Sequence, residues 1–244
     1  MIVLAVLTAV VGTAHGGEAR LAALGPSPAR GLLVNRTVGS RPFDPVDPAR
    51  PAVVVVHGLN PFHPVVHFTL GARYGETLGR RFGNAVQVFA WDWNAVTTTD
   101  LHLGLGLHAN ERFCEEQGRM LAANLIASGI DPARLSFIGQ SSGVIVCASA
   151  SRTIAAHHGR PVARLTMLDP YCKQHDLIFS HLGATSCAST VDHYWVPGPS
   201  GFGKAVALPG VSSTRLSSPR RYRGLARPLH SDHMHAVRWH LEAM

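Results

Sequence analysis

The sequence predicts an α/β protein with a doubly wound, mainly parallel sheet. Segments typical of strands and of helices alternate along one continuous span of the 244 residues, which is the order that parallel sheets require. Residues 52–56, an alanine followed by four valines, are typical of a strand buried on both faces. No break in composition and no internal repeat divides the chain, so we expect a single domain over residues 17–244.

Each expected element follows from hydrophobic spacing and from Gly or Pro at its ends. We expect an edge strand at residues 32–38 and further strands at 52–57, 85–91, 135–138, 163–168 and 190–196. We expect helices at residues 70–82, 108–128, 142–157 and 234–244. Residues 197–228 are rich in Pro, Gly and Ser with little periodicity, which predicts a loop. The ends of several strands then share one edge of the sheet, where the sites of such folds collect.

A serine between two glycines follows the strand at 135–138 and precedes an apolar helix. In that position Gly139-x-Ser141-x-Gly143 fits a nucleophile elbow, in which a strained turn carries the serine and the glycines allow close backbone crossing. Ser141 is therefore the candidate nucleophile, and Ser142 is expected to contribute its backbone N–H. The alternative is a tight strand-to-helix turn without chemistry.

A serine nucleophile needs a histidine that takes its proton and an acid that orients the histidine. Asp169 directly follows the strand at 163–168 and precedes Pro170, so it is the favoured acid. Asp192, which lies inside the next strand, and Asp176 are the alternatives.

The base must follow the acid if the chain order is serine, acid, histidine. His233 lies in a Ser-Asp-His sequence just ahead of the last helix and is the favoured base, with His230 and His235 as alternatives. These three histidines and Asp232 could instead hold a metal, but no partner motif supports that, and we expect neither metal nor cofactor.

His57-Gly58-Leu59 follows the first buried strand. A glycine at this point lets the backbone bend so that the next N–H points into the crevice, as an oxyanion hole requires. We expect the N–H groups of Leu59 and Ser142 to be the two donors. The alternative is that His57 and Gly58 only end the strand.

Taken in this order, the motifs resemble the α/β-hydrolase superfamily, and within it the lipase branch that includes pancreatic and lipoprotein lipases. The lipase resemblance is carried by His57-Gly58-Leu59, by Asp169-Pro170 on the strand right after the elbow strand, and by Trp91-Asp-Trp93. It covers about residues 52–244 and implies the α/β-hydrolase fold, a Ser141–His233–Asp169 triad and acyl-enzyme chemistry without a cofactor. The chain departs from the family pattern at Gln140, where relatives commonly have histidine.

The composition excludes general disorder, since 46% of the residues are hydrophobic and 15% are charged. The net charge of +7 comes from scattered arginines, because Lys173 and Lys204 are the only lysines; we expect no nucleic-acid partner. A denser basic run at 215–227 predicts either a solvated loop or a contact for an acidic partner or membrane surface.

The first residues and the cysteines bear on the compartment. Residues 2–11 are an apolar run too short to span a bilayer, so residues 1–16 predict a signal peptide and a secreted or periplasmic protein, although a basic n-region is missing. An N-terminal apolar segment of the mature fold is the alternative. After export the four cysteines are compatible with disulfides, and Cys172 with Cys187 is the favoured pair.

The sequence as a whole predicts a serine esterase or lipase that acts on lipid-like or small carboxylic esters. An acyltransferase or amidase with the same triad is one alternative, and a catalytically silent hydrolase fold used for binding is another. The expected partner is a small-molecule or lipid ester, with peripheral contact at a lipid interface as a further option. The sequence contains no obvious long lid, although residues 61–68 and 176–188 could cover the site.

Overall fold

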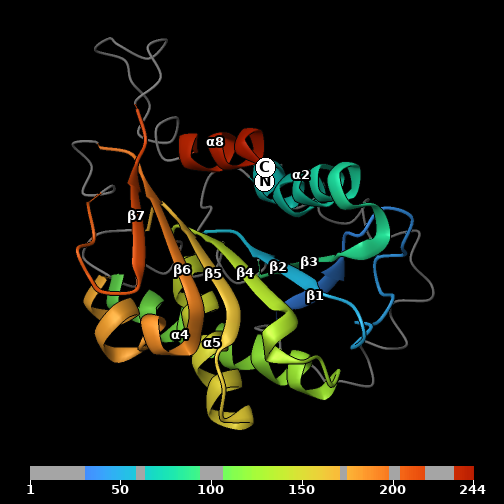
Figure 1. The fold of residues 1–244 in the computed structure, drawn as a ribbon, viewed down its shortest axis with the longest axis horizontal. Coiled ribbons are helices and arrows are strands. Elements are labelled where there is room, and N and C mark those ends of the chain that lie inside the picture. The colour runs from blue at the N-terminus through green and yellow to red at the C-terminus, as the bar shows by residue number, and fades with distance from the viewer. Residues whose placement is uncertain (1–30, 59–63, 94–106, 171–174, 198–203, 218–233) are drawn as a thin grey trace, which may run out of the picture.

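The computed structural model describes residues 31–58, 64–93, 107–170, 175–197, 204–217 and 234–244. Within this part of the chain a seven-stranded sheet has the strand order β1-β3-β2-β4-β5-β6-β7 (Figure 1). β1 runs antiparallel to β3, and every other neighbouring pair is parallel. The predicted fold class, a mainly parallel sheet in an α/β arrangement, is confirmed.

The strands and helices have the following bounds. The strands are β1 (Leu32–Asn35), β2 (Ala52–Val56), β3 (Gln87–Asp92), β4 (Leu135–Gln140), β5 (Val162–Leu168), β6 (Ala188–Trp195) and β7 (Val211–Arg215). The longer helices are α2 (Pro64–Phe82), α4 (Leu107–Ala127), α5 (Gly143–His158) and α8 (His235–Ala243). The short helical segments are η1 (Gly83–Ala85), η2 (Pro132–Arg134), η4 (Leu177–His181) and α6 (Ala184–Cys187).

Helices cover both faces of the sheet (Figure 1). α4 and α5 lie on one face, where Leu121 and Ile145 belong to the larger hydrophobic core. α2 and α8 lie on the other face, over a smaller core that includes Tyr74 and Val237. No helix in the described ranges is both long and apolar enough to cross a membrane.

The helix that follows the elbow, α5, is packed between α4 and the sheet. All of its residues from Gly143 to Ser151 are buried, and small side chains let the neighbouring helix approach closely. A Cβ at Gly118 of α4 would lie 2.5 Å from the Cβ of Ser149 on α5. The helix ends at Gly159, which has the left-handed conformation (φ 69°) that glycine adopts without strain. The start of α5 is therefore held at a fixed place against the sheet.

Besides the short helical segments η1 and η2, three described elements were not predicted from the sequence. β7 lies in the region expected as a loop, and the sequence Val-Ser-Ser-Thr-Arg has no buried residue that would produce an apolar pattern. Main-chain pairing with β6 defines it instead. η4 and α6 lie in the segment 176–188, one of the two segments that could cover the site. Because Ile178, Phe179 and Leu182 are buried in the core beneath α5, this segment is part of the folded body and is not a cover.

The expected disulfide is not formed. Cys187 is a buried free thiol, with its Sγ 3.6 Å from the carbonyl oxygen of Leu182. Cys172, like the expected signal peptide at residues 1–16 and residues 61–63 of the segment at 61–68, lies outside the described residues, while residues 64–68 begin α2. Secretion and the domain limits 17–244 stay predictions.

Candidate active site

Ser141 lies at the sharp turn between β4 and α5. Its φ is +54°, a left-handed conformation that costs a residue with a side chain roughly 1–2 kcal/mol. The turn is held by two backbone hydrogen bonds: the Ser141 N–H donates to the Leu168 carbonyl (3.0 Å), and the Val144 N–H donates to the Ser141 carbonyl (3.0 Å). A strained serine at the end of a parallel strand and ahead of a helix is the geometry of a nucleophile elbow.

The two glycines of the motif are required by space. A Cβ at Gly139 would lie 2.7 Å from the Val144 Cα, where α5 passes over the end of β4. A Cβ at Gly143 would lie 2.5 Å from the carbonyl oxygens of Val56 and His57 at the end of β2. The pattern Gly-x-Ser-x-Gly therefore has the steric origin that the sequence predicted.

Asp169 occupies the corresponding position on the neighbouring strand. In the β4–β5 register Gln140 is the partner of Leu168, so Ser141 and Asp169 each follow the last residue of a matched pair. Asp169 also has a positive φ, +48°, and these two are the only residues other than glycine with that conformation in the described ranges. Its N–H donates to the Tyr194 carbonyl (2.8 Å), and its Oδ1 accepts from the Val196 N–H (3.1 Å).

This environment suits a fixed carboxylate. Asp169 is 1% exposed, and the backbone bond from Val196 orients the side chain. Asp192, the alternative acid, lies two residues before the matched end of β6 and pairs with Thr166 in the register. Its Oδ2 is 3.4 Å from Nη1 of Arg164. Asp169 therefore has the better position for an acid beside Ser141.

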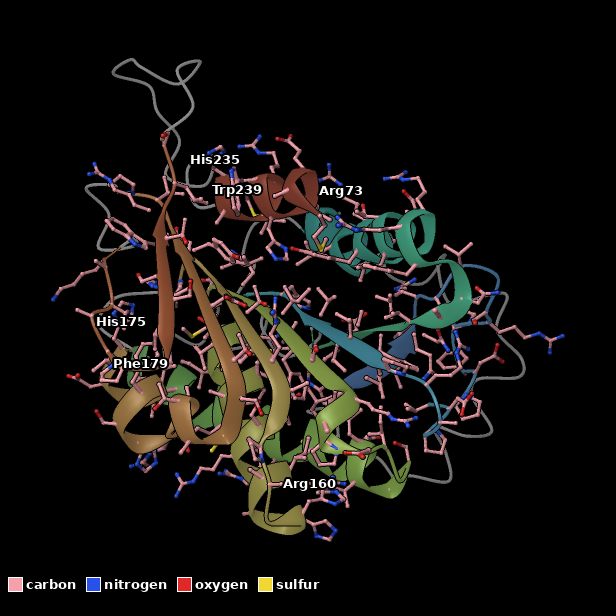
Figure 2. The ribbon with its side chains drawn as sticks, in the orientation of Figure 1. Arg73, Arg160, His175, Phe179, His235 and Trp239 are labelled. Carbon is pink, nitrogen blue, oxygen red and sulfur yellow. The ribbon has the colours of Figure 1, made fainter. Side chains whose placement is uncertain are left out.

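The expected base falls outside the described residues, as does its alternative His230; His233 immediately precedes the described part of the last segment. His235 is described and begins α8, where it lies on the side of the helix turned away from the sheet (Figure 2). α8 packs on the sheet through Trp239, whose ring centroid is 5.1 Å from that of Tyr194. Its His240 Nδ1 lies 3.0 Å from the Tyr74 hydroxyl. Burial, with a smaller contribution from Arg164, lowers the pKa of His240 to about 4, so this histidine is a neutral packing residue.

The end of β2 lies directly against the elbow. A Cβ at Gly58 would be 2.6 Å from the Ser141 Cβ. The Gly58 N–H donates to Oε1 of Gln140 (2.9 Å), and Trp93 Nε1 donates to the His57 carbonyl (3.0 Å). His57 Nδ1 lies 2.8 Å from the Gly58 carbonyl oxygen, and burial lowers the pKa of His57. Leu59, the expected first oxyanion donor, lies outside the described residues.

Gln140 and Trp93 are site residues whose roles the sequence did not reveal. Gln140 was noted only as a departure from a family pattern, and Trp93 only as part of Trp-Asp-Trp. Both bond to a segment far away along the chain: Gln140 is 82 residues from Gly58, and Trp93 is 36 residues from His57. No pattern of neighbouring residues in the sequence indicates such a contact.

Two further histidines, the buried His193 and the half-buried His175, lie together elsewhere in the fold. The rings of His175 and His193 meet edge to face with centroids 5.6 Å apart, and His175 lies beside Phe179 of η4 (Figure 2). His193 Nδ1 is 3.0 Å from Ser213 Oγ, and burial lowers the pKa of His193 to about 3. Within the described ranges no group of three or more His, Cys, Asp or Glu side chains could hold a metal ion.

The strand order, the elbow and the two left-handed residues at matched strand ends define the class of the fold, which is an α/β-hydrolase fold. No protein-family model matches the chain, and no curated protein matches it.

Solved structures with a similar course of the chain include esterase 2 of Thermogutta terrifontis phosphoramylated by tabun, at 11% identity, TM-score 0.43 and coverage of 89% of this chain and 95% of that chain. A dienelactone hydrolase-like promiscuous phosphotriesterase from metagenomic libraries has 13% identity and TM-score 0.45, with coverage of 87% and 96%. An esterase of Pyrobaculum calidifontis has 17% identity and TM-score 0.35, with coverage of 59% and 45%. These similarities carry no activity over to this chain, and the resemblance to the lipase branch stays a prediction from the sequence.

Proposed function

We propose that this protein is a serine hydrolase that cleaves carboxylic esters through an acyl-enzyme. The observation that carries the proposal is Ser141 in a left-handed conformation at the β4–α5 turn, with a buried Asp169 in the same conformation at the matched end of β5. Backbone strain of this kind persists where the surrounding structure enforces it, and it concentrates at functional sites.

The proposed reaction uses Ser141, His233 and Asp169. His233, oriented by Asp169, takes the proton of the Ser141 hydroxyl while Oγ attacks the ester carbonyl. The tetrahedral intermediate collapses, the alcohol leaves with that proton, and an acyl-enzyme remains. Water then attacks the acyl carbonyl as His233 takes a proton from it. The acid is released and Ser141 regains its hydrogen.

The two oxyanion donors in the proposal are the N–H groups of Ser142 and Leu59. Ser142 is the N-cap residue of α5, and the positive end of a helix dipole favours a developing negative charge. The Gly58 carbonyl, which directly precedes Leu59 in the chain, lies 2.8 Å from His57 Nδ1. Each donor of this kind contributes about 3 kcal/mol to the rate.

More specifically, we propose that the protein is an esterase that acts on small or lipid-like esters. The segment 176–188 does not serve as a cover, because Ile178 and Phe179 of that segment are buried in the core. The sequence shows no obvious long lid, and this packing involves one of the two segments that could cover the site.

The adjacent serines provide a matched test. Both are buried, at 8% exposure for Ser141 and 5% for Ser142. We expect a fluorophosphonate probe to label wild type and Ser142→Ala, and both to hydrolyse p-nitrophenyl butyrate. Ser141→Ala should be folded by circular dichroism, unlabelled and inactive. Hydrolysis or labelling retained by Ser141→Ala would exclude Ser141 as the nucleophile. Loss of labelling in Ser142→Ala but not in Ser141→Ala would identify Ser142 as the nucleophile instead.

A further inference from the structure

We propose that Gln140 is a positioning residue, whose amide holds Gly58 at the end of β2 against the nucleophile elbow and so supports the geometry that stabilises the oxyanion beside Ser141. This inference rests on the proposed function of Ser141. Gln140 is the last residue of β4, directly before the nucleophile, and it is 2% exposed.

The first argument is the hydrogen bond itself. The pairing of β2 with β4 ends at Val56 and Gly139, just before the backbone of β4 turns into the elbow. Two residues later, the Gly58 N–H donates to the side-chain oxygen of Gln140 at 2.9 Å. A side chain thus continues the connection between the two strands beyond the end of their main-chain pairing.

The second argument is that both peptide units around Gly58 are held by side chains. The unit between His57 and Gly58 is bonded at its oxygen by Trp93 Nε1 (3.0 Å) and at its N–H by Gln140. The carbonyl of the next unit lies 2.8 Å from His57 Nδ1. A peptide unit is planar, so bonds at both of its ends fix its orientation. The rings of His57 and Trp93 also stack, with centroids 5.7 Å apart.

The third argument is the tight space. A Cβ at Gly58 would lie 2.6 Å from the Ser141 Cβ and 2.7 Å from Gln140 Oε1. A small rotation of the backbone at Gly58 would therefore change its distance to the nucleophile directly. Without Oε1 the buried Gly58 N–H loses this acceptor, which favours a rotation toward another partner. The geometry that stabilises the oxyanion would then be lost, although Ser141 would keep its place in the elbow.

The test replaces the acceptor without changing the length of the side chain. Gln140→Met removes it, and Gln140→Glu keeps a side-chain oxygen at the same position. For Gln140→Met we expect kcat for p-nitrophenyl butyrate to fall by about 10²-fold, similar to the loss of one oxyanion donor, with KM changed less than about threefold. Affinity for a trifluoromethyl ketone, which forms a tetrahedral adduct with serine, should fall in parallel with kcat. Gln140→Glu should recover at least part of both.

Gln87→Met is the matched control. Gln87 is also a 2% exposed glutamine whose Oε1 accepts one backbone N–H, that of Asp47 at 2.8 Å. It lies at the beginning of β3, where it pairs with Ala52 at the opposite end of β2 from Gly58. We expect Gln87→Met to lower the melting temperature and to leave kcat and the affinity for the ketone unchanged.

A second variant tests the same peptide unit from its other end. Trp93→Phe removes the donor to the His57 carbonyl and keeps an aromatic ring, and we expect a fall in kcat without a rise in KM. The proposal is overturned if Gln140→Met and Trp93→Phe, both folded, keep wild-type kcat and ketone affinity, or if Gln87→Met loses kcat equally. If Gln140→Met does not fold, the kcat and the ketone affinity of Trp93→Phe alone decide whether the proposal holds. Fluorophosphonate labelling of wild-type Ser141 reports separately on the proposed function, so the two failures are distinguishable.

Discussion

The left-handed backbone of Ser141 predicts an inverted order of stability for two simple substitutions. In most positions alanine is more stable than glycine, because glycine loses more conformational freedom on folding, by roughly 0.5–1 kcal/mol. At φ +54° alanine carries the strain of the left-handed region and glycine does not. We therefore expect Ser141→Gly to be more stable than Ser141→Ala, while both variants are inactive.

The magnitude follows from a comparison with the next residue. Ser142 is also buried but has φ −61° and ψ −20°, where alanine should be favoured in the ordinary way. The glycine-minus-alanine difference in unfolding free energy at 141, less the same difference at 142, equals the left-handed strain, about 1–2 kcal/mol. In a chain of this size each kcal/mol shifts the melting temperature by about 2–4 °C.

Urea denaturation of the four variants, followed by circular dichroism, measures this double difference. The slopes must agree among the variants, so that the midpoints report stability alone. If glycine gains no more over alanine at 141 than at 142, the native protein does not hold Ser141 in the left-handed conformation. The elbow geometry on which the proposed function rests would then be refuted.

Three further predictions follow from the site and the core. Asp169→Asn keeps an acceptor for the Val196 N–H (3.1 Å) and a residue type that tolerates positive φ, so we expect a folded protein with kcat lower by about 10⁴-fold; unchanged kcat would favour another acid. Gly143→Ala places a Cβ 2.5 Å from two backbone oxygens and should destabilise by about 3 kcal/mol, whereas Gly129→Ala, with φ +74° and open space, should cost roughly 1 kcal/mol; equal losses would contradict the close crossing. Burial lowers the pKa of His193 to about 3, so the stability of the fold that holds this ring neutral is complete above pH 6.5 and is lost as the pH falls from there toward 3. His193→Gln should therefore reduce the drop in unfolding free energy between pH 7 and pH 4.5 by about 2 kcal/mol. An identical drop in both proteins would show that His193 is not held neutral.

The elements closest to the elbow were predictable because their causes are local. A run of valines forms β2, and two glycines around Ser141 are needed where α5 crosses β2 and β4. Asp169 was predicted at a strand end because it directly follows the apolar run of β5. Hydrophobic spacing and turn residues carry this information within about ten neighbouring positions.

Other features have no local cause, and the predictions made from the sequence were wrong there. β7 is polar after its first residue, Val211, and its backbone pairing with β6 defines it as a strand. The segment 176–188, considered from the sequence as a possible cover, contributes Ile178 and Phe179 to the core beneath α5. Cys187, expected in a disulfide, is a free thiol. Each of these outcomes depends on what lies opposite the segment in space.

For this protein the sequence by itself determined the fold class and the order of a serine, an acid and a candidate base along the chain. Only the tertiary structure decided that Ser141 and Asp169 share a left-handed conformation at matched strand ends. It also decided that Gln140 bonds to Gly58, 82 residues away. The physical reason is that a strained dihedral and a hydrogen bond between distant segments exist only once the packed sheet holds both partners in place.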